Sequence, residues 1–280
     1  LFMLQKLSLI NNNINYINFD AFNSNLIHLT GIFLGKNLLR YLEPFTFSSM
    51  KNLNTINLNE NLIEKFDYAP FEGLTKLFTI SINSNKINYI IKPKQSIEFN
   101  CSYLIFRNNF IRYLENFSII NIEQIDISDN KIRSIDKSSF EISLNMSIID
   151  FSQNRIISLR SGLFENTKNV KTIYFSENLL TKIEKDTFMG SENALKTIYL
   201  NRNKIKLIKN FYFQNLTILG ALDLNRNQIS SIEPESFKDL ASLRNLDLSH
   251  NSLFYLNPRL FSNNIGFINL NLGFNLIKKL

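Results

Sequence analysis

Three residues near the end of the chain carry the side chains of a hydrolase catalytic triad. Asp247, Ser249 and His250 occur in the run DLSHN, which ends at Asn251. In a triad of this kind the serine attacks the substrate, the histidine accepts its proton and the aspartate orients the histidine. The run therefore suggests acyl-transfer chemistry, and the local structure that carries it must decide whether this chemistry is available.

The run DLSHN has counterparts elsewhere in the chain, and these keep the aspartate without keeping the histidine. Equivalent positions read DISDN from Asp126, DFSQN from Asp150 and DLNRN from Asp223. The whole chain holds only two histidines, so the counterparts lack a base. We interpret Asp247 and Ser249 as two outward residues of a strand, with His250 beginning the turn after it. The sequence predicts no catalytic residues and no enzyme.

Asn251 is more informative, because its surroundings recur along the whole chain. Apolar residues stand eight, five and three positions before it, and two and five positions after it. The pattern fits twelve times at spacings of 24 residues, apart from single steps of 25, 21 and 25. Such self-similarity predicts a single solenoid domain of about 12 repeats over residues 1–280. The asparagines that mark the repeats are Asn12, Asn37, Asn61, Asn85, Asn109, Asn130, Asn154, Asn178, Asn203, Asn227, Asn251 and Asn275.

Each repeat predicts one short strand, because apolar residues alternate with polar ones just before the asparagine. Stacked strands form a parallel sheet with neighbours ~4.8 Å apart. The strand side of each coil is narrower than the return side, so we expect an arc with the sheet on its concave face. We expect the asparagines to be buried, because one asparagine side chain can serve both a carbonyl and an N–H group of neighbouring coils.

A phenylalanine recurs on the return side of most repeats and predicts a stacked column under the convex surface. Two repeats break this column, with Gln95 and Ile119 at the equivalent position, and the spacing of 21 residues follows. We expect the column to be interrupted and the curvature to change around residues 91–121. The phenylalanines of the column are Phe22, Phe47, Phe71, Phe140, Phe164, Phe188, Phe213, Phe237 and Phe261.

The repeat resembles the leucine-rich repeat, LxxLxLxxNxLxxLxxxxFxxL, in the typical 24-residue subclass common in animal extracellular proteins. The resemblance implies an α/β-type repeat solenoid: a horseshoe with a parallel sheet on the concave face and irregular or short helical segments on the convex side. It also implies a protein-binding ectodomain of a cell-surface or secreted protein, similar to those of Toll-type receptors and chaoptin-like adhesion proteins. An intracellular scaffold or adaptor is the alternative, and an enzyme domain outside this chain is a third.

The ends of the chain predict an internal fragment of a longer protein. The first residues do not form a secretory signal peptide, and neither end has the polar or disulfide cap that a terminal repeat needs. We therefore expect caps, signal peptide, membrane anchor and any signalling domain to lie outside residues 1–280. The chain has no apolar run of 18 residues, so membrane attachment is expected only through such outside segments.

Composition excludes several kinds of site. The net charge is +7, but lysine and arginine are scattered, which argues against nucleic acid as a partner. Cys101 is the only cysteine and occupies an apolar core position, so no internal disulfide or cysteine-based metal site is expected. Phosphate-binding glycine loops, HExxH motifs and calcium loops are also absent, and we predict no cofactor and no metal.

A protein partner is expected on the concave face, where exposed aromatic residues form typical hot spots and aspartates attract basic groups. The sequence is also compatible with a dimer. The ordinary interpretation stays open, since aromatic residues favour strands and aspartate is common at this position of the family. The candidate binding residues are Phe33, Phe78, Tyr103, Ile105, Asp126, Asp150, Tyr174, Tyr199, Asp223 and Asp247.

Four sequons, at Asn100, Asn116, Asn145 and Asn215, are candidates for N-glycosylation. Asparagine, serine and threonine are so frequent here that four sequons do not exceed chance. Their placement is more informative, because all four fall on the flank or convex side of the predicted arc. Glycans at these positions would leave the concave face free.

Overall fold

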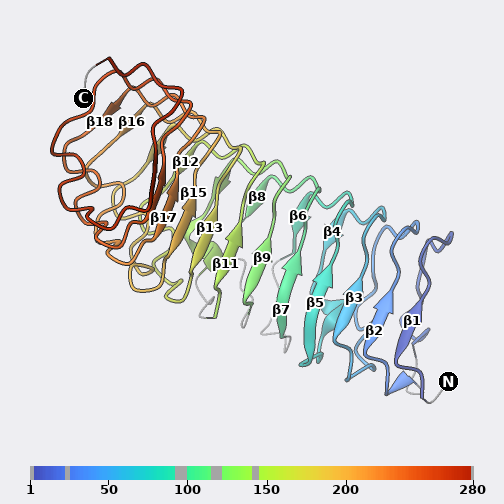
Figure 1. Cartoon of the computed structure of the whole chain (residues 1–280). Coiled ribbons are helices and arrows are strands. Elements are labelled where there is room, and N and C mark those ends of the chain that lie inside the picture. Colours follow the sequence, from blue (N-terminus) through green and yellow to red (C-terminus); the bar gives the residue numbers. More distant parts are fainter. Residues whose placement is uncertain (1–2, 23–25, 92–99, 115–121, 141–144, 279–280) are drawn as a thin grey trace.

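The computed structural model describes residues 3–22, 26–91, 100–114, 122–140 and 145–278, and it forms a curved solenoid. One strand from each coil enters a single twelve-stranded sheet (Figure 1). Neighbouring strands of this sheet are parallel in every pair. The strands, in sheet order, are β1 (Lys6–Ser8), β2 (Gly31–Phe33), β3 (Thr55–Asn57), β5 (Leu77–Ser81), β7 (Cys101–Ile105), β9 (Gln124–Asp126), β11 (Ile148–Asp150), β13 (Thr172–Tyr174), β15 (Thr197–Tyr199), β17 (Ala221–Asp223), β19 (Asn245–Asp247) and β20 (Asn269–Asn271).

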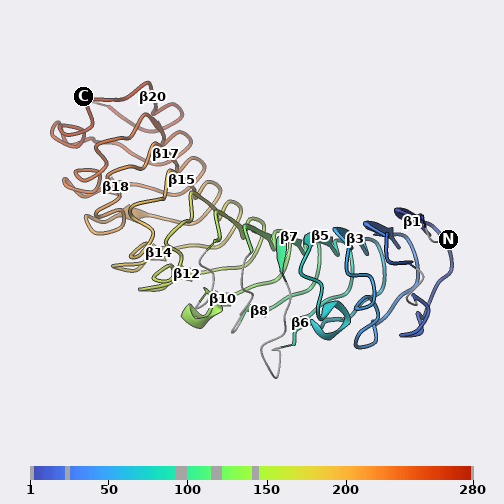
Figure 2. The ribbon, with the colours of Figure 1, turned by 90° about the horizontal axis from the view of Figure 1, so that it is seen from below.

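The sheet lies on the inner side of the arc and the return segments lie on the outer side (Figure 2). The return segments contain the 3-10 helices η2 (Ala69–Phe71) and η3 (Lys137–Phe140) together with strands of two residues. The predicted repeat solenoid, with its inner parallel sheet and mostly irregular outer side, is therefore confirmed. The short strands pair within four small sheets: β4 (Lys65–Phe66) with β6 (Tyr89–Ile90), β8 (Tyr113–Leu114) with β10 (Ser134–Ile135), β12 (Ser158–Leu159) with β14 (Lys182–Ile183), and β16 (Leu207–Ile208) with β18 (Ser231–Ile232).

The strands pair in the register that the repeat predicts. The middle residue of most inner strands is an isoleucine or leucine buried between the sheet and the outer segments, such as Ile56 and Ile149. The residue that follows it points to the inner face, and the register places these residues in one row across the sheet. No helix in the described part of the chain has both the length and the apolar character needed to cross a bilayer.

The repeated asparagines connect each coil to the coil before it. Asn154 is typical: its Nδ2 donates to the carbonyls of Ile127 at 3.0 Å and Phe151 at 3.1 Å, and its Oδ1 accepts the N–H of Ile132 at 2.9 Å. The ten asparagines from Asn37 to Asn251 are buried. The expectation of burial is wrong for Asn12, which is exposed, and Asn275 is only partly buried. Burial needs a coil on each side, and each of these two residues has a described coil on one side only.

The residue before each asparagine has a left-handed backbone. All twelve have φ between 52° and 58°, and none is glycine. Non-glycine residues rarely adopt this conformation. Here it directs the residue's N–H to the next coil: the N–H of Gln153 donates to the carbonyl of Ser176 at 2.9 Å, and that of His250 to the carbonyl of Gly273 at 2.9 Å. The bend allows the asparagine that follows to turn inward.

The phenylalanine column occupies the outer side in two described sections. Rings stack from Phe22 through Phe47 to Phe71 and again from Phe140 to Phe261, with centroids 5.6–6.3 Å apart. Gln95 and Ile119 lie outside the described residues. In Figure 2 the direction of the row of coils changes beyond β7. The predicted change concerned residues 91–121, of which 92–99 and 115–121 lie outside the described residues.

Candidate functional site

The residues of the run DLSHN do not assemble as a triad. Oδ1 of Asp247 accepts the backbone N–H of Ser249 at 2.8 Å, and Oδ2 accepts Nδ2 of Asn271 at 3.2 Å. The imidazole of His250 stacks on the ring of Phe274, with centroids 4.2 Å apart. The hydrogen bonds described for this region therefore join neither Asp247 nor Ser249 to the His250 ring.

Ser249 also corrects a prediction about the inner face. We expected it to point outward with Asp247, but only 4% of its surface is exposed. The chain has already begun to turn at Ser249, and the turn lies between coils. The Ser249 carbonyl accepts the N–H of Arg226 at 3.0 Å and Nδ2 of Asn251 at 3.2 Å. The serine is thus a structural residue of the turn.

Six consecutive strands place a symmetrical set of side chains on the inner face. Two aspartates, two tyrosines and two more aspartates follow one another from β9 to β19, and we call this set the acid–tyrosine row. Each member is directly opposite the next in the strand register. The row consists of Asp126, Asp150, Tyr174, Tyr199, Asp223 and Asp247.

The two tyrosines at the centre of the row form a stacked pair. The ring centroids of Tyr174 and Tyr199 are 4.7 Å apart and the planes differ by 4°. The pKa of Tyr174 is raised above its ordinary value, first by burial and then by the neighbouring Tyr199 and Asp150. Both side chains are partly exposed on the inner face. Their outer ring faces look along the row, one toward β11 and the other toward β17.

The four aspartates of the row each support the turn that follows their strand. In Asp126, Asp150 and Asp247, Oδ1 accepts the backbone N–H of the serine two residues later, at 2.8–2.9 Å. Asp223 makes the same bond to Asn225 at 3.0 Å. A carboxylate has about four acceptor positions, so these bonds leave capacity for a donor from outside the chain.

The surroundings of the two inner aspartates of the row, Asp150 and Asp223, disfavour the charged form of each carboxyl. The pKa of Asp150 is raised, mainly because burial removes water from the carboxylate and further because Asp126 lies beside it; Arg107 and the bonds from Ser152 oppose the rise. The pKa of Asp223 is raised by burial and by Asp247, against the bonds from Asn225. Unfavourable electrostatics of this kind are often found at functional sites.

Replacing Asp150 by asparagine is expected to stabilise the fold slightly at pH 7. A carboxyl whose pKa is higher in the folded protein supports folding when protonated and loses that support as the pH rises through the folded pKa. Asparagine keeps the oxygen that accepts the Ser152 N–H and removes the charge. The melting temperature of Asp150→Asn should exceed that of the wild type at pH 7, and the difference should shrink as the pH falls to about 4. A lower melting temperature at pH 7 would contradict the assignment.

The apolar candidates in the first half of the sheet form a smaller group. Phe78 on β5, whose surface is 48% exposed, packs against Tyr103 on β7 with ring centroids 4.7 Å apart. Ile105 lies two residues further along β7 and is directly opposite Asp126 of the acid–tyrosine row. Phe33 is separate, because β3 lies between its strand and β5. The inner face therefore carries an aromatic pair followed by the acid–tyrosine row.

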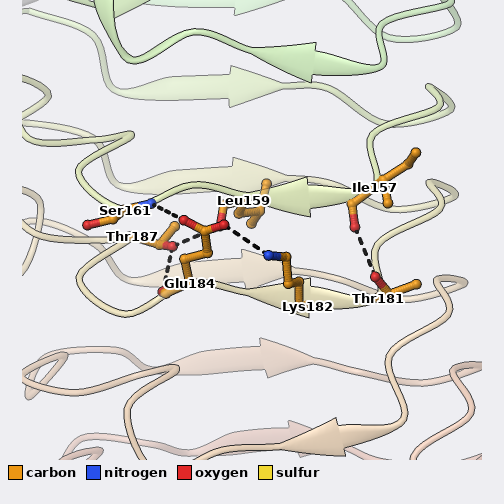
Figure 3. Close-up of polar contacts among 7 residues, drawn as sticks. All are labelled: Ile157, Leu159, Ser161, Thr181, Lys182, Glu184 and Thr187. Atoms are coloured by element: carbon orange, nitrogen blue, oxygen red, sulfur yellow. Dashed lines mark hydrogen bonds and ion pairs between the residues drawn. The ribbon is translucent and has the colours of Figure 1, made fainter.

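The outer side is occupied by polar links between neighbouring coils. Figure 3 shows one such set, in which Glu184 accepts the backbone N–H of Ser161 at 3.3 Å and pairs with Lys182 at 3.1 Å. These contacts lower the pKa of Glu184, the hydrogen bond from Lys182 most strongly. Cys101 lies in the core, where burial raises the pKa of its thiol to about 12. We assign structural roles to these residues.

The structure also shows exposed tyrosines that the sequence analysis did not select. Five tyrosines each stand four residues after a repeated asparagine and are 45–60% exposed: Tyr16, Tyr41, Tyr89, Tyr113 and Tyr255. Tyr41 and Tyr89 border a hollow of about 740 Å³ that Phe66 and Phe71 also line. Reading this position repeat by repeat would have revealed the set.

The family comparison decides what kind of repeat this is. The profile described as "Leucine rich repeat" matches residues 27–87, 145–194 and 193–253, which together are more than half of the chain. The chain belongs to the leucine-rich repeat family. The comparison with curated proteins found no match.

Solved structures show the same leucine-rich repeat fold at low sequence identity. A chain of the Toll–Spatzle complex, described as a molecular hub in Drosophila development and innate immunity, matches with a TM-score of 0.75 and 22% identity over 98% of this chain and 35% of that chain. The leucine-rich repeat domain of APL1B matches with a TM-score of 0.73 and 23% identity, over 90% and 70% of the two chains. A chain from a complex of latrophilin 3, Unc5D and the FLRT2 repeats matches with a TM-score of 0.76 and 20% identity, over 96% of this chain and 83% of that chain.

Proposed function

We propose that residues 1–280 form a single protein-binding repeat domain in the ectodomain of a cell-surface or secreted protein, with the partner on the inner face. The observation that carries this proposal is the stacked, partly exposed pair of Tyr174 and Tyr199 on a rigid sheet. Tyrosines are enriched at binding hot spots because they offer a large contact area at little entropic cost. The complexes with Spatzle and with latrophilin 3 and Unc5D provide support by analogy, since they contain similar repeat chains.

The sequons agree with an extracellular place for this domain. Asn145 and Asn215 are exposed, Asn100 is partly exposed just before β7, and Asn116 lies outside the described residues. Asn145 and Asn215 lie away from the acid–tyrosine row, so glycans there would leave the row accessible. The alternative, an intracellular scaffold, is favoured by the free thiol of Cys101. A mass decrease after glycosidase treatment of the protein from its natural source would exclude that alternative.

Replacing both Tyr174 and Tyr199 by alanine is expected to lower the affinity for the native partner by tenfold or more while leaving the fold intact. The loss removes two hot-spot side chains, each of which contributes about 1–2 kcal/mol. Partners would be captured on the immobilised domain from medium and membrane extracts of the source tissue and quantified by mass spectrometry, with affinities then measured on the purified partner.

The matched control replaces two exposed tyrosines of the outer side, Tyr89 and Tyr113, by alanine. This control variant should retain every partner. If circular dichroism shows that both variants are folded, equal affinity of a purified partner for the inner-face variant and for the wild type would contradict the proposed docking surface.

A further inference from the structure

The acid–tyrosine row contains two equivalent steps. An aspartate side chain is much shorter than a tyrosine side chain, so the outer face of each tyrosine ring rises above the carboxylate of the next strand. Asp150 and Tyr174 form one step, and Tyr199 and Asp223 form the other, in direct strand register. The ring pair is stacked, so the two free ring faces look in opposite directions along the row. Each step thus presents a ring face on one side and a carboxylate below.

Both surfaces of a step attract the same kind of group. The face of an aromatic ring carries negative electrostatic potential and binds cations within about 6 Å of its centre. The carboxylate adds a full negative charge and unused acceptor positions. A planar guanidinium can lie on the ring and direct its N–H groups to the carboxylate, whereas an ammonium group has no plane to stack.

Within the described part of the chain, no lysine or arginine forms an ion pair with the row, although the net charge is +7. The four ion pairs found among the described residues, those of Glu60, Glu177, Glu184 and Glu235, all lie outside the row. Arg107, which follows β7, lowers the pKa of Asp150, and Asp126 on β9, the strand between β7 and β11, raises it. A basic group brought by a partner would therefore meet carboxylates that form no ion pair among the described residues, with Arg107 offsetting only part of the charge at Asp150.

We propose that the acid–tyrosine row binds two arginine side chains of a protein partner, one in each step. This inference rests on the proposed function and specifies the chemistry of the partner. The partner's two guanidinium groups must lie about 12 Å apart, since each stacks about 3.7 Å outside a ring pair whose centroids are separated by 4.7 Å. An extended segment rises about 3.3 Å per residue and alternates its faces, so arginines four positions apart meet this requirement.

The test uses labelled peptides titrated against the whole chain by fluorescence anisotropy at low ionic strength. The probe is Arg-Thr-Ser-Thr-Arg with blocked ends. Its controls are Arg-Arg-Thr-Ser-Thr, which changes only the spacing, Lys-Thr-Ser-Thr-Lys, which keeps the charge, and Glu-Thr-Ser-Thr-Glu, which inverts it. We expect the probe to bind at least threefold more tightly than the first two controls, and the glutamate peptide not to bind.

The protein variants separate a specific site from a general attraction of charge. The double variant Asp150→Asn, Asp223→Asn keeps the oxygens that support the turns, and its affinity for the probe should be about tenfold lower. The control double variant Asp20→Asn, Asp239→Asn raises the net charge by the same two units at positions away from the inner face. Its affinity for the probe should equal that of the wild type. Equal binding of the probe to the wild type and to the Asp150/Asp223 variant overturns the inference, and so does equal binding of the two arginine peptides.

The proposed function can survive that failure. If a native partner is lost by the variant lacking Tyr174 and Tyr199 but is retained by the Asp150/Asp223 variant, the inner face binds protein without the two arginines. If the native partner is retained by both variants, both the proposed docking surface and the proposed binding of two arginines are contradicted.

Discussion

Alanine in place of Asn154 should lower the free energy of unfolding by about 3 kcal/mol. The substitution removes the donor to the carbonyl of Ile127 and the acceptor for the N–H of Ile132, and both of these residues are fully buried. The Ile132 N–H loses its acceptor, and a buried backbone group left without a partner costs roughly 1–3 kcal/mol. The Ile127 carbonyl keeps the bond from Nδ2 of Asn130 at 3.2 Å, so the lost bond there costs only about 1 kcal/mol more. Denaturant titration followed by circular dichroism measures the loss, and Asn166→Ala, at an exposed position on the outer side, provides the control.

The damage should also be local. In a solenoid each coil contacts only its neighbours, so the coils on either side of Asn154 should open first. Hydrogen exchange at the Ile132 amide should accelerate by at least tenfold, while amides of the coils around β19 keep their rates. Unchanged exchange at Ile132 would show that the side chain contributes less than its hydrogen bonds indicate.

Alanine in place of Phe164 is expected to have the largest effect on stability, a loss of about 3–5 kcal/mol. Phe164 is fully buried in the outer column, where it stacks on Phe140 and on Phe188 with centroids 5.9 Å away on each side. A cavity at this position interrupts the column between two coils, and neighbouring rings held by their own coils cannot close it. The unfolding midpoint in denaturant measures the loss.

Two further variants test this explanation. Phe164→Leu keeps most of the volume and should cost clearly less than the alanine variant. Phe254→Ala removes an exposed ring and should change stability by no more than about 0.5 kcal/mol. A cost for Phe164→Ala no greater than that for Phe254→Ala would show that the column does not hold the coils together.

The strand register could be predicted from the sequence because one asparagine marks the same point in every coil. Once Asn154 and Asn178 are aligned, Asp150 must stand opposite Tyr174, and the pairing agrees. The alternation of buried and outward residues then follows from strand geometry. The candidate row on the inner face was therefore visible in the sequence as a set of positions.

What the pattern could not supply were the contacts that depend on neighbouring coils. The burial of Ser249 depends on the coil that contains Arg226, and the exposure of Asn12 depends on having a described coil on one side only. The left-handed residues before each asparagine are also absent from the pattern, because that position holds residues as different as Lys36 and His250. The orientation of the Tyr174 and Tyr199 rings required coordinates for the same reason.

The in-register stacking of the coils restricts how the inner face can change during evolution. Inserting or deleting a whole repeat shifts every later side chain by one strand, about 4.8 Å, and leaves the asparagine bonds and the phenylalanine column in place. A single extra residue is accommodated only on the return side: the repeat from Asn178 to Asn203 is one residue longer than most and keeps both the asparagine bonds and the ring stack of Phe188 on Phe213. Within a strand, a single insertion would move every later side chain to the opposite face. The separation between the aromatic pair of Phe78 and Tyr103 and the acid–tyrosine row can thus vary only in steps of one coil. Partners with differently spaced contacts would select for repeat number, while substitutions within the row would adjust their chemistry.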